Sequence, residues 1–441
     1  MNQRDVTLSH DRAHVWHPYT QMQEYLEQGA PLVLERAQGS RLFDVDGRSY
    51  LDGNASWWAS ALGHQHPRLV KALCDQAAKM CHVALANIAH EPSAALATEL
   101  CEIAPAGLSR VFYSDDGSTA VEVALKLALQ YWGQNGRPAR TRFLALDGAY
   151  HGDTMAASSV SGIELFRRPF GGVLIDCLRV PPGADGYAAA FEVLGGLLAQ
   201  HADELAAVIV EPIAQGAAGM RFYDPEFLRA LRELTREHDV FLICDEVFTG
   251  YGRTGPFWAS QHAAVEPDLL CTAKGFTGGM LPMSATLASE RIFSGFMGDA
   301  TRTFFYGHTF CGNPLGAALA REVLRVFKDE DVLAVAAGKA ARIAQAFAGF
   351  RALPGVAETR SLGMIGALDL EGSHRASAAA GGAPRDRYLE TRGRRVCAEA
   401  LKRGAYLRPL GNTIYITPSL NIPDPDLDEL LDIVEDSVRA S

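Results

Sequence analysis

Two acidic residues and one lysine directly follow short apolar runs, where α/β proteins often place reactive groups. Asp245 and Glu246 follow the run 240–244, and Lys274 follows the run 269–273 and precedes a glycine-rich loop. Ligands of α/β sheets bind at the carboxyl ends of strands, so Asp245 and Lys274 are candidates for one site. A partly desolvated lysine has a lowered pKa and can act as an amine nucleophile toward an aldehyde. Together they predict pyridoxal 5'-phosphate attached through Lys274, with Asp245 on its pyridine nitrogen.

Both residues also have a structural interpretation. An acid at a strand end often caps the following turn, and a lysine there often lies on the surface with its stem against apolar side chains. The occurrence of both residues after apolar runs of one chain favours the cofactor site.

The residues from Gly117 to Glu122 have the pattern of a phosphate-binding turn. Gly117 and Ser118 follow the strand-like run 111–114 and open an amphipathic helix of about 14 residues. A helix N-terminus presents free N–H groups and a positive dipole end to a phosphate, and Ser118 adds a hydroxyl. Thr119 and Glu122 also match an ordinary capping box, so this turn alone is not diagnostic.

The sequence pattern around these residues predicts that a large α/β domain positions them. From residue 66 to 326, helical patterns alternate with short apolar runs, typical of a mainly parallel sheet with flanking helices. Residues 1–65 read as short extended pieces around a hairpin turn at Asp46-Gly47, and we expect them to contribute to a small domain. Residues 327–441 predict a smaller α+β domain with strand-like pieces at 361–372 and 413–419, and its Ala- and Gly-rich segment 373–387 is expected to be a mobile loop.

The composition narrows the function classes. The 41 Lys and Arg residues against 52 Asp and Glu residues give a net charge of −11, which disfavours nucleic acid as a partner. The eight cysteines are dispersed without the paired spacing typical of a metal site, so we predict no metal and a reducing compartment. With no apolar leader or membrane span apparent, we expect a cytoplasmic protein that acts on small molecules.

Six ordered segments resemble the class III, fold type I aminotransferases over nearly the whole chain. They are SDDGS (114–118), GAYHGDT (148–154), VEPIAQGAAGM (210–220), CDEVFTGYGRTG (244–255), AKGFTGG (273–279) and GHTFCGNPLG (307–316). The resemblance implies the fold type I architecture of transferases dependent on pyridoxal phosphate. It also implies that Lys274 is the Schiff-base lysine and Asp245 the partner of the pyridinium nitrogen.

The same resemblance assigns further cofactor contacts. Gly117 and Ser118 would hold the phosphate, together with Thr309 from the second subunit of a homodimer whose active sites lie at the subunit interface. Tyr150 would stack on the cofactor ring, a role that suits its planar side chain.

Five more residues in or near these motifs have less defined roles. Asp153 and Arg253 are second choices for the site, and either could brace it through an ion pair. His151 is expected to be a hydrogen-bonded structural histidine. Asp116 is unfavourable beside a phosphate unless it points away and caps the helix. His308 departs from the GPTF sequence of relatives that use S-adenosylmethionine.

Three other segments resemble one subgroup of the family, which forms 7,8-diaminopelargonate from 7-keto-8-aminopelargonate in biotin biosynthesis. They are HVWHPYTQMQEY (14–25), DGNASWWASALGHQHP (52–67) and YLRPLGNTIYITPSL (406–420). By this resemblance Tyr19 and Trp57 line the substrate pocket with Tyr150 and Lys274, and Arg408 holds the substrate carboxylate. Tyr19 is also a catalytic candidate. We expect the Trp57-Trp58 pair on an extended segment, where at most one of the two would face the pocket.

Several alternatives remain open. The amino donor is S-adenosylmethionine or, because the GHTF, FYSDDG and GIELF segments are more similar to relatives that use it, lysine. The substrate could instead be that of another class III ω-amino-acid aminotransferase, such as an ornithine derivative, 4-aminobutyrate or a polyamine. A non-catalytic cofactor-binding protein and an aminomutase are the remaining alternatives.

Overall fold

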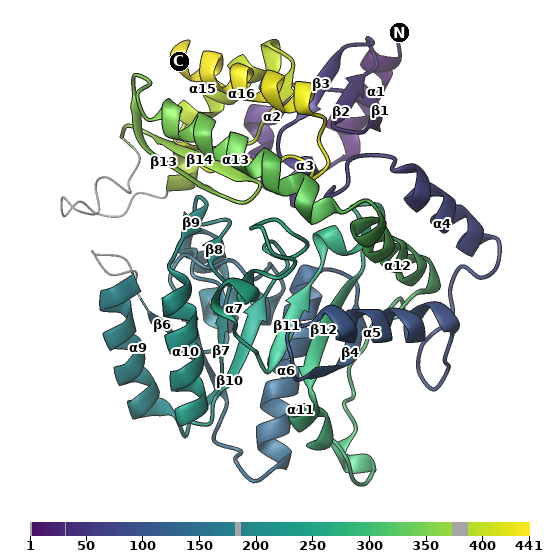
Figure 1. The fold of residues 1–441 in the computed structure, drawn as a ribbon, viewed down its shortest axis with the longest axis vertical. Coiled ribbons are helices and arrows are strands. Elements are labelled where there is room, and N and C mark those ends of the chain that lie inside the picture. Colours follow the sequence, from purple (N-terminus) through teal and green to yellow (C-terminus); the bar gives the residue numbers. More distant parts are fainter. Residues whose placement is uncertain (1, 31, 181–186, 373–386) are drawn as a thin grey trace.

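The computed structural model describes residues 2–30, 32–180, 187–372 and 387–441. A large sheet with helices on both faces forms the lower part of the molecule, and smaller sheets with their own helices form the upper part (Figure 1). The predicted mobile loop 373–387 lies, except for Arg387, outside the described residues.

The strands of the described residues are short, as buried strands of α/β proteins usually are. They are β1 (Leu34–Gln38), β2 (Arg41–Asp44), β3 (Ser49–Asp52), β4 (Leu108–Ser114), β5 (Arg142–Leu146), β6 (Cys177–Val180), β7 (Leu205–Val210), β8 (Ala214–Gln215), β9 (Arg221–Phe222), β10 (Phe241–Asp245), β11 (Leu269–Thr272), β12 (Ser284–Ser289), β13 (Val356–Leu362), β14 (Ile365–Leu370), β15 (Ala405–Tyr406) and β16 (Thr413–Ile416).

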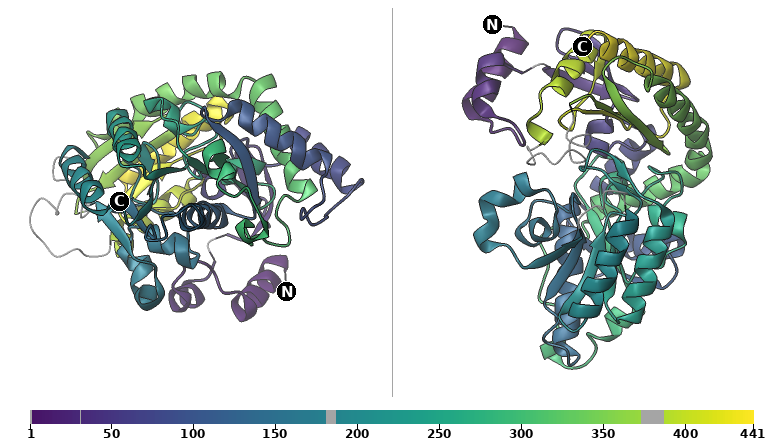
Figure 2. Two further views of the ribbon diagram at one scale, coloured as in Figure 1. Left: turned by 90° about the horizontal axis from the view of Figure 1, so that it is seen from below. Right: turned by 90° about the vertical axis from the view of Figure 1, so that its left-hand side faces the viewer.

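The helices surround these strands (Figure 2). They are α1 (Gln3–His14), α2 (Met22–Gln28), α3 (Ala55–Trp58), α4 (Pro67–Ala77), α5 (Glu91–Ile103), α6 (Gly117–Gln134), α7 (Met155–Val160), α8 (Glu164–Arg167), α9 (Tyr187–His201), α10 (Pro225–Glu237), α11 (Glu290–Ser294), α12 (Pro314–Asp329), α13 (Val332–Phe350), α15 (Arg392–Lys402) and α16 (Asp424–Arg439). In the described part of the chain, none of them is both long and apolar enough to cross a membrane.

The large sheet has the strand order β4-β12-β11-β10-β7-β5-β6. Neighbouring strands from β11 to β6 are parallel, whereas β12 runs antiparallel to both β11 and β4. The strands β7, β10 and β11 are buried along their whole length. The predicted mainly parallel sheet is therefore confirmed, and its uninterrupted apolar runs reflect burial on both faces.

Successive residues of the central strands pack into different cores. In β10, Phe241 and Ile243 belong to a cluster with α6, whereas Leu242 and Cys244 belong to a cluster with α9 and α10. Each fully buried Leu, Ile or Phe side chain contributes about 1.5–3 kcal/mol through the apolar surface it removes from water. The two clusters hold β10 between helical layers, so that its carboxyl end is a rigid support for Asp245.

The upper part joins the two ends of the chain. Its sheet β1-β2-β3-β15 pairs β15 in parallel with β3, with Ala405 opposite Leu51, and a second sheet has the order β13-β14-β16. Both termini lie in this upper part (Figure 1). The predicted hairpin at Asp46-Gly47 is present between the antiparallel strands β2 and β3, with Gly47 at φ +82°. The domain boundaries at residues 65 and 326 remain predictions.

Two local predictions were wrong. Residues 3–28 were expected to be extended but contain α1 and α2, neither of which has a buried residue. The strand-like piece 361–372 is divided by a turn at Gly363, which has φ +53° and separates β13 from β14. An added Cβ at Gly363 would lie 2.4 Å from the backbone of Thr254, so this turn requires glycine.

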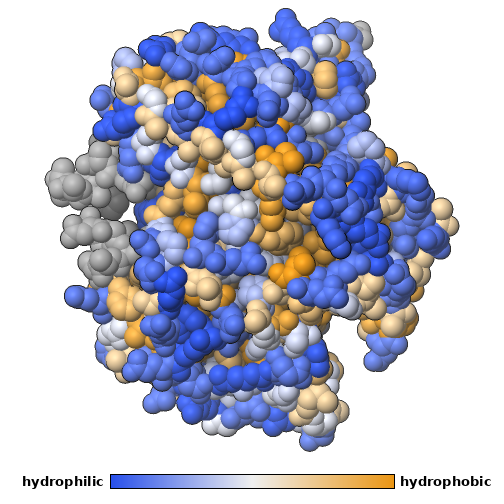
Figure 3. Space-filling model, viewed as in Figure 1, coloured by the Kyte–Doolittle hydropathy of each residue, from blue (hydrophilic) through white to orange (hydrophobic). Residues whose placement is uncertain are grey.

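The residues at the periphery of the face shown in Figure 3 are mainly hydrophilic. On the face shown in Figure 3, apolar residues gather toward the middle, where the upper and lower parts meet. The cavities described below lie between residues of these two parts.

Candidate active site

The structure places Asp245 and Lys274 at the carboxyl ends of two adjacent parallel strands. Asp245 is the last residue of β10 and pairs in register with Cys271 of β11. Lys274 follows β11 and opens a short 3-10 turn, Lys274–Thr277, with φ +51°. Burial lowers the pKa of Lys274, while the nearby carboxylates of Asp245 and Glu211 act in the opposite direction. A lysine in this setting loses its proton more readily than one in water.

A cavity of about 390 Å³ opens above these strand ends. Its wall comes from the turns after β4 and β5 and from the ends of β7, β10 and β11. The predicted residues that line it are Gly117, Ser118, Tyr150, Asp245 and Lys274. Segments that are far apart in the sequence thus meet in one site.

The turn before α6 is capped differently from the expected pattern. Asp116 is the N-cap, and its Oδ1 accepts a hydrogen bond of 2.9 Å from the Thr119 N–H. The Asp116 N–H donates in return to the Thr119 Oγ1 at 2.9 Å. Glu122 is not the capping partner of Thr119, because its Oε1 accepts from the Ala156 N–H at 2.9 Å. Asp116 therefore caps the helix, as considered from the sequence, and Glu122 ties α6 to α7.

Two glycines let the backbone close tightly around this turn. A Cβ on Gly117 would lie 2.7 Å from Val247 Cγ1, and one on Gly152 would lie 2.2 Å from Ser118 Oγ. Gly152 also has φ +118°, which L side chains rarely adopt. Because the Thr119 N–H is bonded to Asp116, the N–H groups of Gly117 and Ser118, which have no intrahelical acceptors, are those that face a ligand. Narrow walls, free N–H groups and the Ser118 hydroxyl make a cradle that fits a phosphate.

Two hydrogen bonds fix the Asp245 carboxylate. The buried His151 donates from Nδ1 to Asp245 Oδ2 at 2.7 Å, and the Val247 N–H donates to Oδ1 at 3.1 Å. His151 is thus a hydrogen-bonded histidine, as expected. A carboxylate held in this way can meet a cationic ring nitrogen without rearranging.

Glu211 is a site residue that the sequence analysis missed. It follows β7, lines the same cavity, and accepts hydrogen bonds from the N–H groups of Tyr150 and Gly216, each at 3.0 Å. Burial raises its pKa to about 7, and the neighbouring Asp245 adds to this rise while His151 opposes it. The available signal was an acid directly after a buried strand, the same pattern that identified Asp245.

A second, larger cavity of about 780 Å³ continues outward from Lys274. At its wall the hydroxyls of Tyr19 and Tyr150 both donate to Asp153 Oδ2, at 2.6 and 2.7 Å. Burial, together with the hydrogen bond to Asp153, raises the pKa of both phenols. Asp153 therefore braces two aromatic walls through hydrogen bonds rather than through an ion pair.

Arg408 and Trp57 meet in the same cavity. The guanidinium carbon of Arg408 lies 3.8 Å from the Trp57 ring centroid and 5.8 Å from that of Tyr19. The Arg408 N–H donates to Asn54 Oδ1 at 2.7 Å, which anchors the backbone of the arginine. A guanidinium stacked on an aromatic ring keeps its N–H groups directed outward in its own plane, where a carboxylate can bind.

The extended conformation predicted for the tryptophan pair was wrong. The four residues Ala55 to Trp58 have φ values from +44° to +75° and form a left-handed turn. The alternation of a strand does not apply here, and both indoles reach cavities: Trp57 lines the larger one, and Trp58 lines both. The Lys274 Nζ lies 5.2 Å from the Trp58 ring centroid. Left-handed residues cost about 1–2 kcal/mol each, so strong packing must hold this turn.

Arg253 and Thr309 lie outside both cavities. Arg253 is buried, and its guanidinium donates to the Pro418 carbonyl at 2.7 Å. This contact is a hydrogen bond and not the ion pair that was considered. Burial lowers its pKa to about 10. Thr309 is exposed and does not line either cavity of its own chain.

The fold and the site together define a family. A family profile described as Aminotransferase class-III matches residues 24–438. The chain belongs to the class III aminotransferases, and it is an aminotransferase with the type I fold of enzymes dependent on pyridoxal phosphate.

Individual relatives are more specific. The chain is 40% identical to the adenosylmethionine-8-amino-7-oxononanoate aminotransferase of Geobacter sulfurreducens, over 97% of this chain and 96% of the relative. It is 41% identical to that of Nitratidesulfovibrio vulgaris, over 98% and 81%. The crystal structure of the Methanocaldococcus jannaschii enzyme of the same name superposes with a TM-score of 0.94 at 34% identity, over the whole of both chains. An omega transaminase from Pseudomonas jessenii in complex with PMP has a TM-score of 0.90 at 28% identity, over 98% and 97%.

Proposed function

We propose that the protein transfers an amino group to 8-amino-7-oxononanoate, also called 7-keto-8-aminopelargonate, to give 7,8-diaminopelargonate in biotin biosynthesis. The observation that carries this proposal is Arg408 stacked on Trp57 in a cavity that begins at Lys274. A long aliphatic keto acid needs an apolar channel for its chain and a guanidinium for its carboxylate. The names of the relatives support the same acceptor.

The proposed cofactor is pyridoxal 5'-phosphate. When bound, it supplies an aldehyde that takes up and releases the amino group and a ring that withdraws electrons from the reacting carbon. Gly117 and Ser118 would hold its phosphate in the glycine-lined cradle, Asp245 would face the ring nitrogen, and Tyr150 would stack on the ring. Lys274 would be its covalent attachment.

The side chains of the site divide the work of the reaction. Lys274 would be the proton carrier: its lowered pKa lets Nζ take a proton from the reacting carbon of the donor and pass it to the bound cofactor, and the second half of the cycle would run the same transfer in reverse. Asp245, fixed by His151, would stabilise a proton on the ring nitrogen of the cofactor. Tyr19 and Tyr150 stay neutral because both donate to Asp153, and they form aromatic walls for two substrates in turn.

The amino donor remains a choice between two molecules. The names of the relatives include adenosylmethionine, whereas the GHTF, FYSDDG and GIELF segments are similar to relatives that use lysine. Either donor enters the same cavity before the keto acid, since both reactions use Lys274.

We also propose a homodimer with active sites at the subunit interface. The exposed Thr309 supports this arrangement, because it lines neither of the two cavities described above and is accessible to a second subunit. Sedimentation of the purified protein should give twice the mass of the 441-residue chain. A monomer that retains full activity would contradict the shared site.

An assay with one acceptor and two donors tests the function. Purified protein with pyridoxal phosphate and 8-amino-7-oxononanoate is incubated with either S-adenosylmethionine or lysine, and diaminopelargonate is detected by mass. Product with one donor supports the proposed acceptor and identifies the donor. No product with either donor, while the cofactor spectrum responds to other amines, would favour another ω-amino-acid aminotransferase; structures 28% identical to this chain are named omega transaminases.

A further inference from the structure

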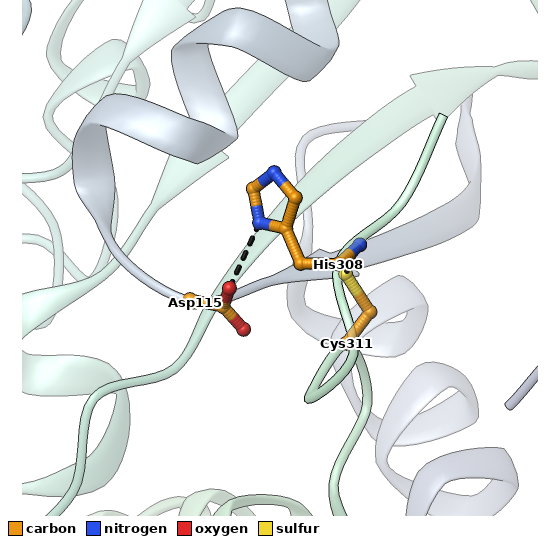
Figure 4. Close-up of side chains that lie close together, drawn as sticks. All are labelled: Asp115, His308 and Cys311. Carbon is orange, nitrogen blue, oxygen red and sulfur yellow. Dashed lines mark hydrogen bonds and ion pairs between the residues drawn. The ribbon is translucent and has the colours of Figure 1, made fainter. Parts of the chain in front are cut away.

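Three potential metal ligands lie together beside the phosphate-binding turn (Figure 4). Asp115 follows β4 and lines the smaller cavity, whereas His308 and Cys311 belong to the loop before α12. His308 Nδ1 lies 2.8 Å from Asp115 Oδ2, and one ligand atom from each of the three residues lies within 4.8 Å of the others. The dispersed cysteines had indicated no metal, and sequence spacing could not reveal this cluster, since Asp115 and His308 are 193 positions apart.

The loop that carries His308 and Cys311 is tightly folded. The His308 N–H donates to the Cys311 Sγ at 3.1 Å, and the Cys311 N–H donates to the His308 carbonyl at 3.2 Å. Gly312, at φ +67°, and Asn313, which caps α12, end the loop. A backbone N–H therefore fixes the Cys311 thiol, and the hydrogen bond to Asp115 fixes the His308 imidazole.

The three donor atoms indicate which ion the cluster would take. Oxygen, imidazole nitrogen and thiolate sulfur together are typical of zinc, whereas magnesium and calcium prefer oxygen ligands alone. Three protein ligands also leave a fourth tetrahedral position for water. We propose that Asp115, His308 and Cys311 form a zinc-binding site at the edge of the smaller cavity.

The position of this site beside the phosphate cradle gives the ion a second effect. Asp115 and Asp116 place two carboxylates beside the cradle in which we propose that the cofactor phosphate binds. A divalent cation on Asp115 would offset the repulsion between these acids and a phosphate. It would also fix the loop that contains Thr309. This consequence depends on the proposed cofactor site, whereas zinc binding itself does not.

The competing interpretation is an ion pair without metal. The side chains of His308 and Asp115 are about one-third exposed, at 31% and 33%. A protonated His308 could pair with Asp115 there, as many partly exposed ion pairs do. Such a pair does not require the Cys311 thiol, so Cys311 distinguishes the two interpretations.

The test measures zinc on the intact protein with its cofactor bound. Protein treated with a chelator is titrated with Zn²⁺ by calorimetry, and the zinc retained after gel filtration is counted by mass spectrometry. We expect one zinc per chain in the wild type, and an affinity at least about tenfold lower in Cys311→Ser, His308→Ala and Asp115→Asn. Cys81→Ser, which alters an exposed cysteine elsewhere, should bind as the wild type does.

A crystal of the zinc-treated protein locates the ion by anomalous scattering at the zinc edge, which does not depend on how the variants fold. A peak between the three side chains supports the proposal. Absence of zinc from the wild type, or binding that Cys311→Ser leaves unchanged, would overturn it and favour the ion pair. Because no turnover is measured, a wrong substrate proposal would not affect either result.

Discussion

At the scale of residues, the site is arranged around two buried acids that are already positioned. Asp245 is fixed by His151 and Val247, and Glu211 by two backbone N–H groups. Such preorganised groups stabilise charge without a reorganisation cost during the reaction. Substitutions of single residues can therefore measure separately the contributions of proton transfer, substrate binding and buried charge.

Lys274→Ala should abolish product formation while leaving cofactor binding possible. The variant loses the amine that carries the proton, whereas the phosphate cradle and Asp245 remain. We expect that dialysis removes the cofactor from the variant under conditions in which the wild type retains it. Mass spectrometry should detect no diaminopelargonate. Lys402→Ala, at the exposed end of α15, is the control. Appreciable turnover by Lys274→Ala would remove Lys274 from the mechanism.

Arg408→Ala should weaken binding of the keto acid by about 2–5 kcal/mol, because it removes the charge proposed to pair with a desolvated carboxylate. The change should appear in the KM for 8-amino-7-oxononanoate. Arg403→Ala, which removes an arginine paired with Glu399 outside the cavities, should change it by less than about 0.5 kcal/mol. Unchanged affinity in Arg408→Ala would place the carboxylate elsewhere.

The raised pKa of Glu211 predicts a pH-dependent stability. Its pKa rises from 4.5 in the unfolded chain to about 7 in the folded protein, so the folded state keeps a proton that the unfolded state has released. The resulting penalty grows as the pH rises through this window and is constant above it. From pH 5 to pH 8, the unfolding free energy of Glu211→Gln should rise by about 2–3 kcal/mol relative to the wild type. Urea denaturation at both pH values measures this; a constant difference would contradict the raised pKa.

At the scale of elements, the phosphate-binding turn depends on the close approach of two loops. Gly152→Ala would place a methyl group 2.2 Å from Ser118 Oγ at φ +118°, so the loop must move away from α6. We expect the Kd for pyridoxal phosphate to rise at least about tenfold, which corresponds to about 1.4 kcal/mol. An absorbance titration measures it. Gly171→Ala, with no neighbour within 4 Å, is the control, and equal affinities would show that the cradle tolerates the shift.

Elements with strong apolar patterns could be predicted, and elements without them could not. The buried strand β10 and the amphipathic α16 stand out in the sequence because burial demands apolar residues. By contrast, α1 and α2 bury no residue, so no apolar stripe marks them. The left-handed turn Ala55 to Trp58 has no local signal either, since its residues are not those that favour positive φ.

The residues of the site likewise divide into those that an apolar pattern identified and those that it did not. Asp245 and Lys274 were found because each ends an apolar run, and both lie at one cavity in the structure. Contacts between distant segments, such as Arg408 on Trp57, were suggested only by resemblance. The Asp115 and His308 contact was not foreseen, because sequence spacing carries no information about segments that meet only through the fold.

At the scale of the whole molecule, the parallel pairing of β15 with β3 has a consequence for synthesis on the ribosome. The Leu51 N–H donates to the Gly404 carbonyl and the Gly53 N–H to the Tyr406 carbonyl, at 2.7 and 3.1 Å. At translation rates of about 5–20 residues per second, strand β3 must wait roughly 20 to 70 s for its partner. During that time its edge is open to other chains. The end of the cavity formed by Trp57 and Arg408 is therefore among the last parts of the enzyme to assemble, after the large sheet has been translated.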